Sequence, residues 1–117
     1  MKTFGLTVIG DSIVCNKKKG VIYDWTRNLN KKIFKKTKVK LLIKKKIVHG
    51  INSRGLLNLL PDFLHKINHN FKDMIIFQIG INDSWHYKSL KGYACVPIKE
   101  FKKNLNEIVE KSKLYNF

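Results

Sequence analysis

The chain has 117 residues, of which 44% are hydrophobic and 27% are charged. This length and composition suit one domain with a buried core and exclude a disordered tail. No apolar run approaches the roughly 20 residues that a membrane-spanning helix needs. Lys and Arg number 24 against 8 Asp and Glu, a formal charge of +16 that favours nucleic acid or an anionic membrane surface as a partner.

The kind of charge argues against a specific nucleic-acid partner. All the cations except Arg27 and Arg54 are lysines. Lysine is a hydrated point charge, whereas base and phosphate recognition favours the planar fork of arginine. We therefore interpret the lysines as a solvated surface and expect no specific nucleic-acid function.

The N-terminus and the cysteines bear on the compartment. The chain runs directly from Met1 into an apolar, strand-like segment, without the pattern of a signal peptide. Cys15 and Cys95 are too few for a disulfide framework, and no metal-ligand spacing is present. The sequence predicts one domain over residues 1–117, cytoplasmic, with reduced thiols and neither a metal nor a cofactor.

Hydrophobic patterning predicts strands and helices in alternation. Strands are expected over residues 4–9, 39–48 and 73–79, and helices over residues 23–36, 53–67 and 97–113. Lys44–Lys46 interrupt the second strand, and Asn52 or Ser53 is the expected cap of the second helix. Right-handed crossovers turn this order into a three-layer, flavodoxin-like α/β sandwich with a parallel sheet.

The chain ends soon after the third helix, where a parallel sheet would continue with another strand. The third strand is highly apolar and, as an edge strand, would leave one row of backbone groups unpaired. The sequence therefore predicts a domain that is incomplete at its C-terminus.

Each predicted strand is followed by a turn that contains glycine. The three turns are Gly10–Ser12, His49–Asn52 and Gly80–Asp83. In an open α/β sheet, the loops at the carboxyl ends of the strands form the ligand crevice. These turns offer a hydroxyl, backbone N–H groups and a side-chain amide, which are the nucleophile and oxyanion donors that acyl transfer requires.

The same turns resemble the sequence blocks of the SGNH (GDSL-type) serine hydrolases, which include esterases, lipases, thioesterases and acetylesterases. Residues 8–14 resemble the first block, which implies Ser12 as the nucleophile and a further oxyanion donor in its backbone N–H. Residues 50–57 and 79–83 resemble the second and third blocks. The resemblance implies Gly50 and Asn82 as oxyanion-hole donors, supported by the residues Gly10, Asp11, Gly80 and Asp83.

The resemblance covers the chain as the N-terminal portion of a family domain and implies a small ester, thioester or other acylated substrate. The family's last block, Asp-x-x-His, which carries the base and its carboxylate, is missing. Two such strings occur elsewhere, at Asp62–His65 and Asp83–His86. His86 is the candidate for a substitute base, although a partly exposed surface histidine is the favoured interpretation.

Three explanations for the missing base remain open. The sequence is a truncated product, it pairs with a second polypeptide that supplies the rest, or it is a non-catalytic relative. In the second and third cases the unpaired edge strand is the docking site for a protein partner. A different hypothesis is nonspecific nucleic-acid binding through the lysines.

Overall fold

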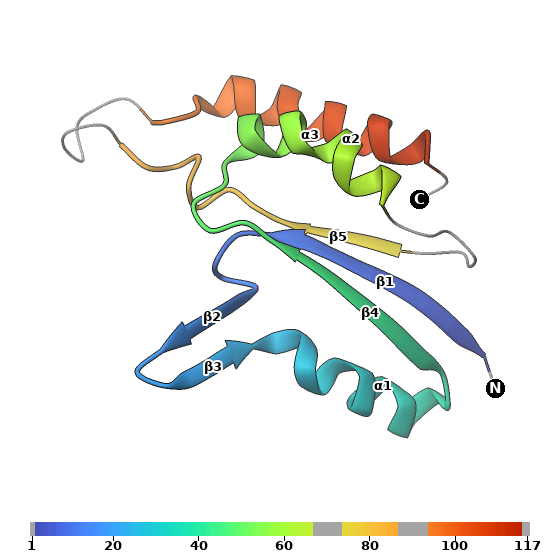
Figure 1. Cartoon of the computed structure of the whole chain (residues 1–117). Coiled ribbons are helices and arrows are strands. Elements are labelled where there is room, and N and C mark those ends of the chain that lie inside the picture. The colour runs from blue at the N-terminus through green and yellow to red at the C-terminus, as the bar shows by residue number, and fades with distance from the viewer. Residues whose placement is uncertain (1, 67–73, 87–93, 116–117) are drawn as a thin grey trace. The chain divides into compact units, whose positions relative to one another are not determined.

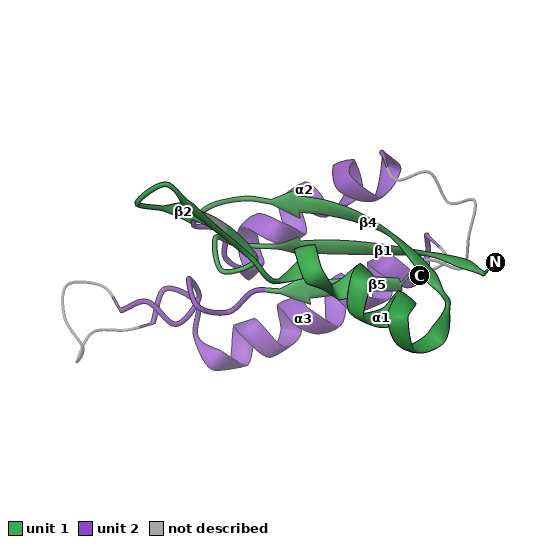
Figure 2. Ribbon diagram, turned by 90° about the horizontal axis from the view of Figure 1, so that it is seen from below, with its two compact units in different colours: residues 1–49, 69–78, 117 green, residues 50–68, 79–116 purple. Residues whose placement is uncertain are grey.

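The computed structural model describes residues 2–66, 74–86 and 94–115. The elements follow one another as β1 (Thr3–Gly10), β2 (Cys15–Lys18), β3 (Val21–Asp24), η1 (Trp25–Asn28), α1 (Leu29–Thr37), β4 (Lys40–Ile47), α2 (Ser53–His65), β5 (Met74–Gln78) and α3 (Ile98–Lys113) (Figure 1). They divide into two compact units (Figure 2). The sheet unit contains residues 1–49, 69–78 and 117, and the helical unit contains residues 50–68 and 79–116.

The sheet unit is built on a parallel three-stranded sheet in the order β4-β1-β5. Strand β1 is central, and its last six residues are buried. Gly10 at its end is aligned with Ile47 of β4 and with Gln78 of β5. The three strands therefore end level with one another, at the edge of the sheet where the Gly10–Ser12 turn begins.

Helix α1 packs on one face of this sheet. The core there is formed by Leu6 and Val8 of β1, Leu41 of β4 and Val14. Leu29 and Ile33, one helical turn apart on α1, pack against it. The Asn30 side chain adds a polar tie, because its Oδ1 accepts a hydrogen bond from the Leu41 N–H at 2.9 Å.

The hairpin of β2 and β3 is the main departure from the sequence prediction. A helix was expected to begin at Tyr23, but Tyr23 lies in β3, and the helical turns begin at Trp25. Lys19 and Gly20 both have positive φ, 49° and 79°, which is the backbone of a tight two-residue hairpin turn. The helical spacing of the apolar residues continues backwards from α1 into this segment, and it was wrong as a guide to where the helix starts.

The lysine run 44–46 does not interrupt β4 either. All three residues pair with β1, in register with Thr7, Val8 and Ile9. Among the described residues β4 pairs on one side alone, so its lysine stems can extend into solvent from an edge strand.

The helical unit consists of α2, α3 and the segments that precede α3. Leu56, Leu60 and Leu64 form a buried stripe on α2 at a spacing of four residues. Ser53 near the start of α2 contacts Asn104 of α3, and the rings of His65 and Tyr115 meet edge-to-face beyond the other ends of the helices. The two helices therefore run in the same direction.

The structure confirms an α/β fold with a parallel three-stranded sheet and helices. Strand β5 pairs with β1 alone among the described residues, as expected for an edge strand. No helix within the described ranges is both long and apolar enough to cross a membrane.

Candidate functional site

Ser12 lies in the turn that leaves the central strand. The turn is closed by Asp11, whose backbone oxygen accepts from the Val14 N–H at 3.2 Å and whose Oδ1 accepts from the Ile13 N–H at 2.9 Å. Asp11 is buried, and its own N–H donates to the Gln78 oxygen at the end of β5. The carboxylate of Asp11 thus holds the turn in which Ser12 lies.

Gly10 is required by close packing at this turn. A Cβ atom at Gly10 would lie 2.5 Å from the Gln78 backbone oxygen and 2.7 Å from a methyl carbon of Val14. Both distances are shorter than any van der Waals contact, so a side chain would push the turn away from β5.

The Ser12 side chain is half-buried. Within the described residues of the sheet unit, its hydroxyl has no hydrogen-bond partner. A serine nucleophile needs an accessible hydroxyl and a base to take its proton. The sheet unit provides the first of these requirements.

Gly50 and Asn82, the two expected oxyanion donors after Ser12, lie together in the helical unit. The Asn82 Nδ2 donates to the backbone oxygen of Ile51, the residue after Gly50, at 2.8 Å. This bond uses one of the two amide hydrogens and fixes the direction of the other. Gly50 has a φ of 75°, a left-handed conformation that glycine adopts without strain.

Asn52 caps helix α2 immediately after this turn. Its Oδ1 accepts from the Gly55 N–H at 2.9 Å, which confirms the first of the two expected caps. Residues 50–52 therefore form the segment that leads directly into α2, and Asn82 is hydrogen-bonded to this segment.

Asp83 fixes this arrangement through a buried polar network. Both of its carboxylate oxygens accept from the Ser53 N–H, at 2.9 and 3.0 Å, and Oδ1 also accepts from the Ser53 hydroxyl. The Ser53 hydroxyl in turn accepts from the Asn104 amide of α3 at 2.8 Å. All three residues are buried. The negative charge lies at the N-terminus of α2, where the helix dipole favours it.

The network gives Asp83 a role that the sequence did not reveal. Asp83 caps α2, whose first residue lies 30 positions earlier in the chain. Its neighbour Gly80 has a φ of 128° and faces the Phe101 ring, so this residue too is held against α3.

His86, the candidate for a substitute base, lines a cavity in the helical unit. The cavity has a volume of about 280 Å³, and its other lining residues include Gly80, Asp83, Ser84 and Phe101. His86 itself is exposed and forms an isolated antiparallel bridge with Ala94. The Asp83 carboxylate is committed to Ser53, so the Asp83–His86 string is not built as a base with its orienting carboxylate.

The other Asp-x-x-His string is remote from Gly50 and Asn82. Asp62 and His65 lie in the last turn of α2, and His65 follows Ser53 by 12 residues, about 18 Å at the rise of an α-helix. The His65 ring packs edge-to-face on Tyr115, with ring centres 6.0 Å apart. This histidine is a packing residue at the opposite end of the helix.

Two carboxylates outside the glycine-containing turns, those of Asp24 and Glu100, have lowered pKa values. Burial alone would raise the pKa of Asp24, but hydrogen bonds from Lys45 and Thr26 outweigh it and hold that pKa below its ordinary value. The hydrogen bond from the Arg54 guanidinium lowers the pKa of Glu100. Both are structural pairs: Lys45 belongs to β4, and Arg54 links α2 to α3.

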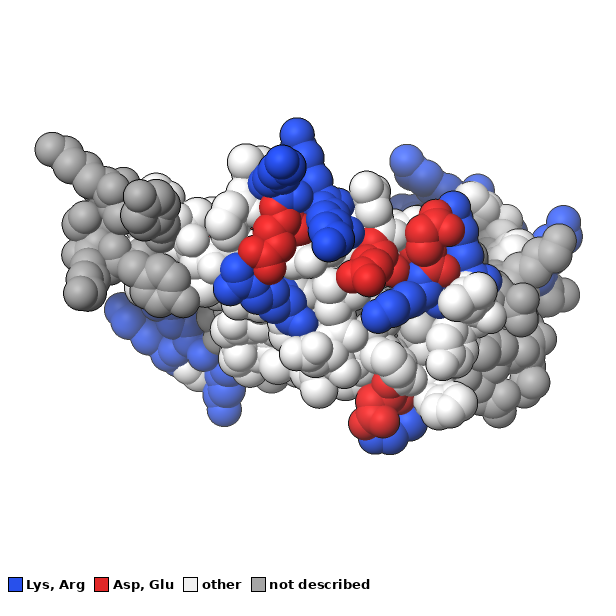
Figure 3. Space-filling view, turned by 90° about the horizontal axis from the view of Figure 1, so that it is seen from above, with Lys and Arg blue, Asp and Glu red and all other residues white. Residues whose placement is uncertain are grey.

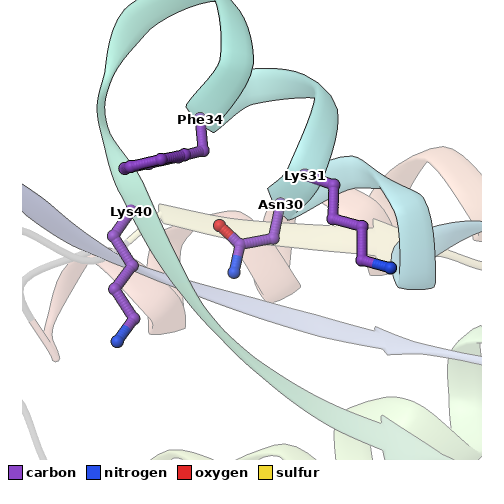
Figure 4. A pocket seen from close by; sticks show the side chains of 4 residues that line it. All are labelled: Asn30, Lys31, Phe34 and Lys40. Atoms are coloured by element: carbon purple, nitrogen blue, oxygen red, sulfur yellow. The ribbon is translucent and has the colours of Figure 1, made fainter.

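A second cavity, of about 360 Å³, lies between α1 and the beginning of β4 (Figure 4). Its lining includes Asn30, Phe34 and Lys40. Lys40 pairs with Thr3 at the start of β1, about 23 Å along the strand from Gly10. This cavity is at the opposite end of the sheet from the Gly10–Ser12 turn. No group of three or more potential metal ligands occurs in the part of the chain that the structure describes.

Comparison with known proteins shows the fold. No family model and no curated protein matches the chain. The chain is similar to the crystal structure of TesA, with a TM-score of 0.69 and 21% identity over 96% of this chain and 56% of TesA. It is also similar to the psychrotrophic esterase EstA from Pseudoalteromonas sp., in a structure inhibited by monoethylphosphonate. There the TM-score is 0.66 and the identity 20%, over 96% of this chain and 55% of EstA.

These similarities confirm the SGNH-type α/β fold that the sequence predicted. At such identities they establish the fold alone. The chain spans slightly more than half the length of both proteins, 56% and 55%.

Proposed function

We propose that the chain carries the nucleophile and oxyanion hole of an SGNH-type serine hydrolase that cleaves ester or thioester bonds. The observation that supports this most is the fixed Asn82 amide. One hydrogen bond to the Ile51 oxygen joins it to the turn that holds Gly50, so the two oxyanion donors that the resemblance implies in separate turns lie together. Ser12 follows the end of β1, which is level with the ends of β4 and β5.

In the proposed reaction the Ser12 oxygen attacks the carbonyl carbon of the substrate. The carbonyl electron pair moves onto oxygen, and the Ser12 N–H, the Gly50 N–H and the Asn82 amide stabilise that charge. The tetrahedral intermediate collapses and expels the alcohol or thiol, which takes the proton that Ser12 gave to a general base. Water then hydrolyses the acyl-enzyme and regenerates the Ser12 hydroxyl.

In this proposal, neither of the two Asp-x-x-His strings supplies a general base together with its carboxylate. We assign it to a residue beyond Phe117 or to a second polypeptide, with His86 as the candidate within the chain. The fold similarity fits this assignment, because the chain spans 56% of TesA and 55% of EstA.

Hydrolysis of p-nitrophenyl acetate by the protein as its gene encodes it tests the proposal. Replacing Ser12 by Ala is expected to lower kcat by at least about 10³-fold. The matched control is Thr37→Ala, which removes a hydroxyl at the far end of α1 and should leave the rate unchanged. Full activity in Ser12→Ala would exclude Ser12 as the nucleophile.

A second candidate function follows from β5. This strand carries four consecutive apolar residues, Met74–Phe77, and in the described structure it pairs on one side alone. The occupant that we infer for its other edge is a strand of the polypeptide that supplies the general base. Size-exclusion chromatography of the chain distinguishes a protein that docks a partner from an isolated monomer. A stable complex that gains esterase activity supports docking, and a compact inactive monomer that gains no partner contradicts it.

A further inference from the structure

We infer that the β2–β3 hairpin is a docking surface for an anionic lipid bilayer. The hairpin directly follows the Ser12 turn and extends away from the end of the sheet (Figure 1). The inference depends on the hairpin and its charge and does not require Ser12 to be a nucleophile.

The cross-strand pairs make both faces of the hairpin amphipathic. Lys17 is paired with Ile22, and Lys18 is paired with Val21. Directly opposed residues in an antiparallel pair share a face, so each face presents one lysine beside one branched aliphatic side chain. Such a pair suits a membrane interface, because the aliphatic group enters the acyl boundary while the lysine extends to the phosphates.

The apolar side chains of the hairpin are exposed to solvent. Val21, Ile22 and Tyr23 are 52%, 44% and 59% exposed, and Ile13, just before the hairpin, is 54% exposed. Val21 and Tyr23 lie on one face of β3 and Ile22 lies on the other, so both faces of the hairpin expose apolar side chains. Tyr23 also matches the amphipathic aromatic residues that gather at membrane interfaces.

The base of the hairpin is held firmly, so this exposure does not come from a frayed segment. The Asp24 carboxylate accepts from the Thr26 N–H and hydroxyl and pairs with Lys45 of β4. The Trp25 Nε1 donates to Gln78 Oε1 of β5 at 2.8 Å. The hairpin is therefore tied to both outer strands of the sheet and presents its tip outward.

The charge of the sheet unit complements an anionic surface. Among the described residues of this unit, the acidic ones are Asp11 and Asp24, and the side chains of both are buried. Lys17–Lys19 are all exposed. The helical unit differs, because its acidic residues lie between basic ones, as in the pairs Arg54–Glu100 and Lys113–Glu110 (Figure 3).

The side-chain chemistry favours lipid over nucleic acid. Single-stranded nucleic acid is bound by aromatic rings that stack on bases, together with arginine. The hairpin instead presents the aliphatic groups of Val21 and Ile22 with a single exposed ring, that of Tyr23, and the Trp25 indole is engaged with Gln78. Branched aliphatic side chains cannot stack on bases, whereas they partition readily into an acyl boundary.

Co-sedimentation of the full chain with vesicles of phosphatidylglycerol and phosphatidylcholine tests the inference, with pure phosphatidylcholine as the neutral surface. Ile22→Asp is expected to weaken binding at least tenfold. The matched control is Val109→Asp on α3, which is 45% exposed and should bind as the wild type does. Equal losses in both variants, or equal binding to neutral vesicles, would overturn the inference.

Lysine variants separate a hairpin site from general attraction. Replacing Lys17 and Lys18 by Gln should weaken binding roughly fivefold per lysine. The same change at the exposed Lys31 and Lys32 of α1 should have a smaller effect. Equal effects would show that net charge alone holds the protein on the vesicle and would contradict a dedicated hairpin surface.

A fluorescence measurement covers the case in which Ile22→Asp fails to fold. Tryptophan introduced by Ile22→Trp should shift its emission to the blue when anionic vesicles are added, whereas Val109→Trp should not. An unchanged spectrum of Ile22→Trp, or hairpin-dependent binding to a single-stranded oligonucleotide without binding to vesicles, would overturn the lipid assignment.

Discussion

At the scale of single residues, the turn after β1 is defined by steric and polar constraints that leave little freedom. Gly10 passes against the Gln78 backbone, and Asp11 closes the turn with its side chain. The sequence predicted this turn correctly, because Gly-Asp-Ser is turn chemistry that depends on near neighbours. It could not predict the contact with Gln78, which lies 68 positions further along the chain.

Gly10→Ala is expected to destabilise the protein by about 3 kcal/mol, the upper part of the range for overpacking. The reason is the 2.5 Å approach of the added Cβ to a backbone oxygen, which cannot rotate away. Urea unfolding measures the change. The control is Gly55→Ala in α2, where the new Cβ lies 3.3 Å from a movable Ile51 side chain. Equal stabilities of the two variants would contradict the packing described for Gly10.

Asp24 makes the stability of the sheet unit depend on pH. Its folded-state pKa lies below the ordinary 3.8, so the stabilisation is fully present above that pH and is lost as the pH falls through the folded value. Asp24→Asn should cost about 2 kcal/mol at pH 7, typical of hydrogen bonds to a charged group.

The gap between wild type and Asp24→Asn should therefore shrink when unfolding is measured below pH 3.8. Glu110→Gln, an exposed partner of Lys113, serves as the control and should change stability little at any pH. A gap for Asp24→Asn that stays constant down to pH 2.5 would mean that its carboxylate does not carry this stabilisation.

At the scale of secondary-structure elements, the sequence predicted the helices α2 and α3 from their hydrophobic period, and the three sheet strands from short apolar runs followed by turn residues. It missed the β2–β3 hairpin, whose two strands have only four residues each and are too short and exposed to show either pattern. It also missed the network by which Asp83 joins the start of α2 to α3, because that network depends on residues far apart in the chain.

Asp83→Ala is expected to lower the free energy of unfolding by about 3 kcal/mol, since it leaves the buried N–H and hydroxyl of Ser53 without their acceptor. Asp62→Ala removes an exposed carboxylate of α2 and should change stability by less than about 0.5 kcal/mol. Thermal or urea unfolding compares the two. A small effect at Asp83 would show that the network does not hold the helical unit together.

At the scale of the whole molecule, the fold and the length of the chain are better guides to its function than its net charge. The chain has the fold of TesA and EstA but spans slightly more than half of each. Its charge of +16 is unevenly distributed, with the described acidic residues of the sheet unit buried and those of the helical unit mostly paired or exposed. The sequence predicted the fold and the three turns, but not that the described acidic side chains of the sheet unit would be buried while Lys17–Lys19 of the hairpin are exposed.

The assignment of Ser12 as the nucleophile is tested most directly by covalent labelling. The protein as its gene encodes it is incubated with an activated ethylphosphonate p-nitrophenyl ester, and the adduct is located by peptide mass spectrometry. We expect one adduct on Ser12, absent from Ser12→Ala and formed about 10²–10³-fold more slowly in Asn82→Ala, which removes an oxyanion donor. Labelling that persists in Ser12→Ala, or that is as fast in Asn82→Ala as in the wild type, would contradict the account.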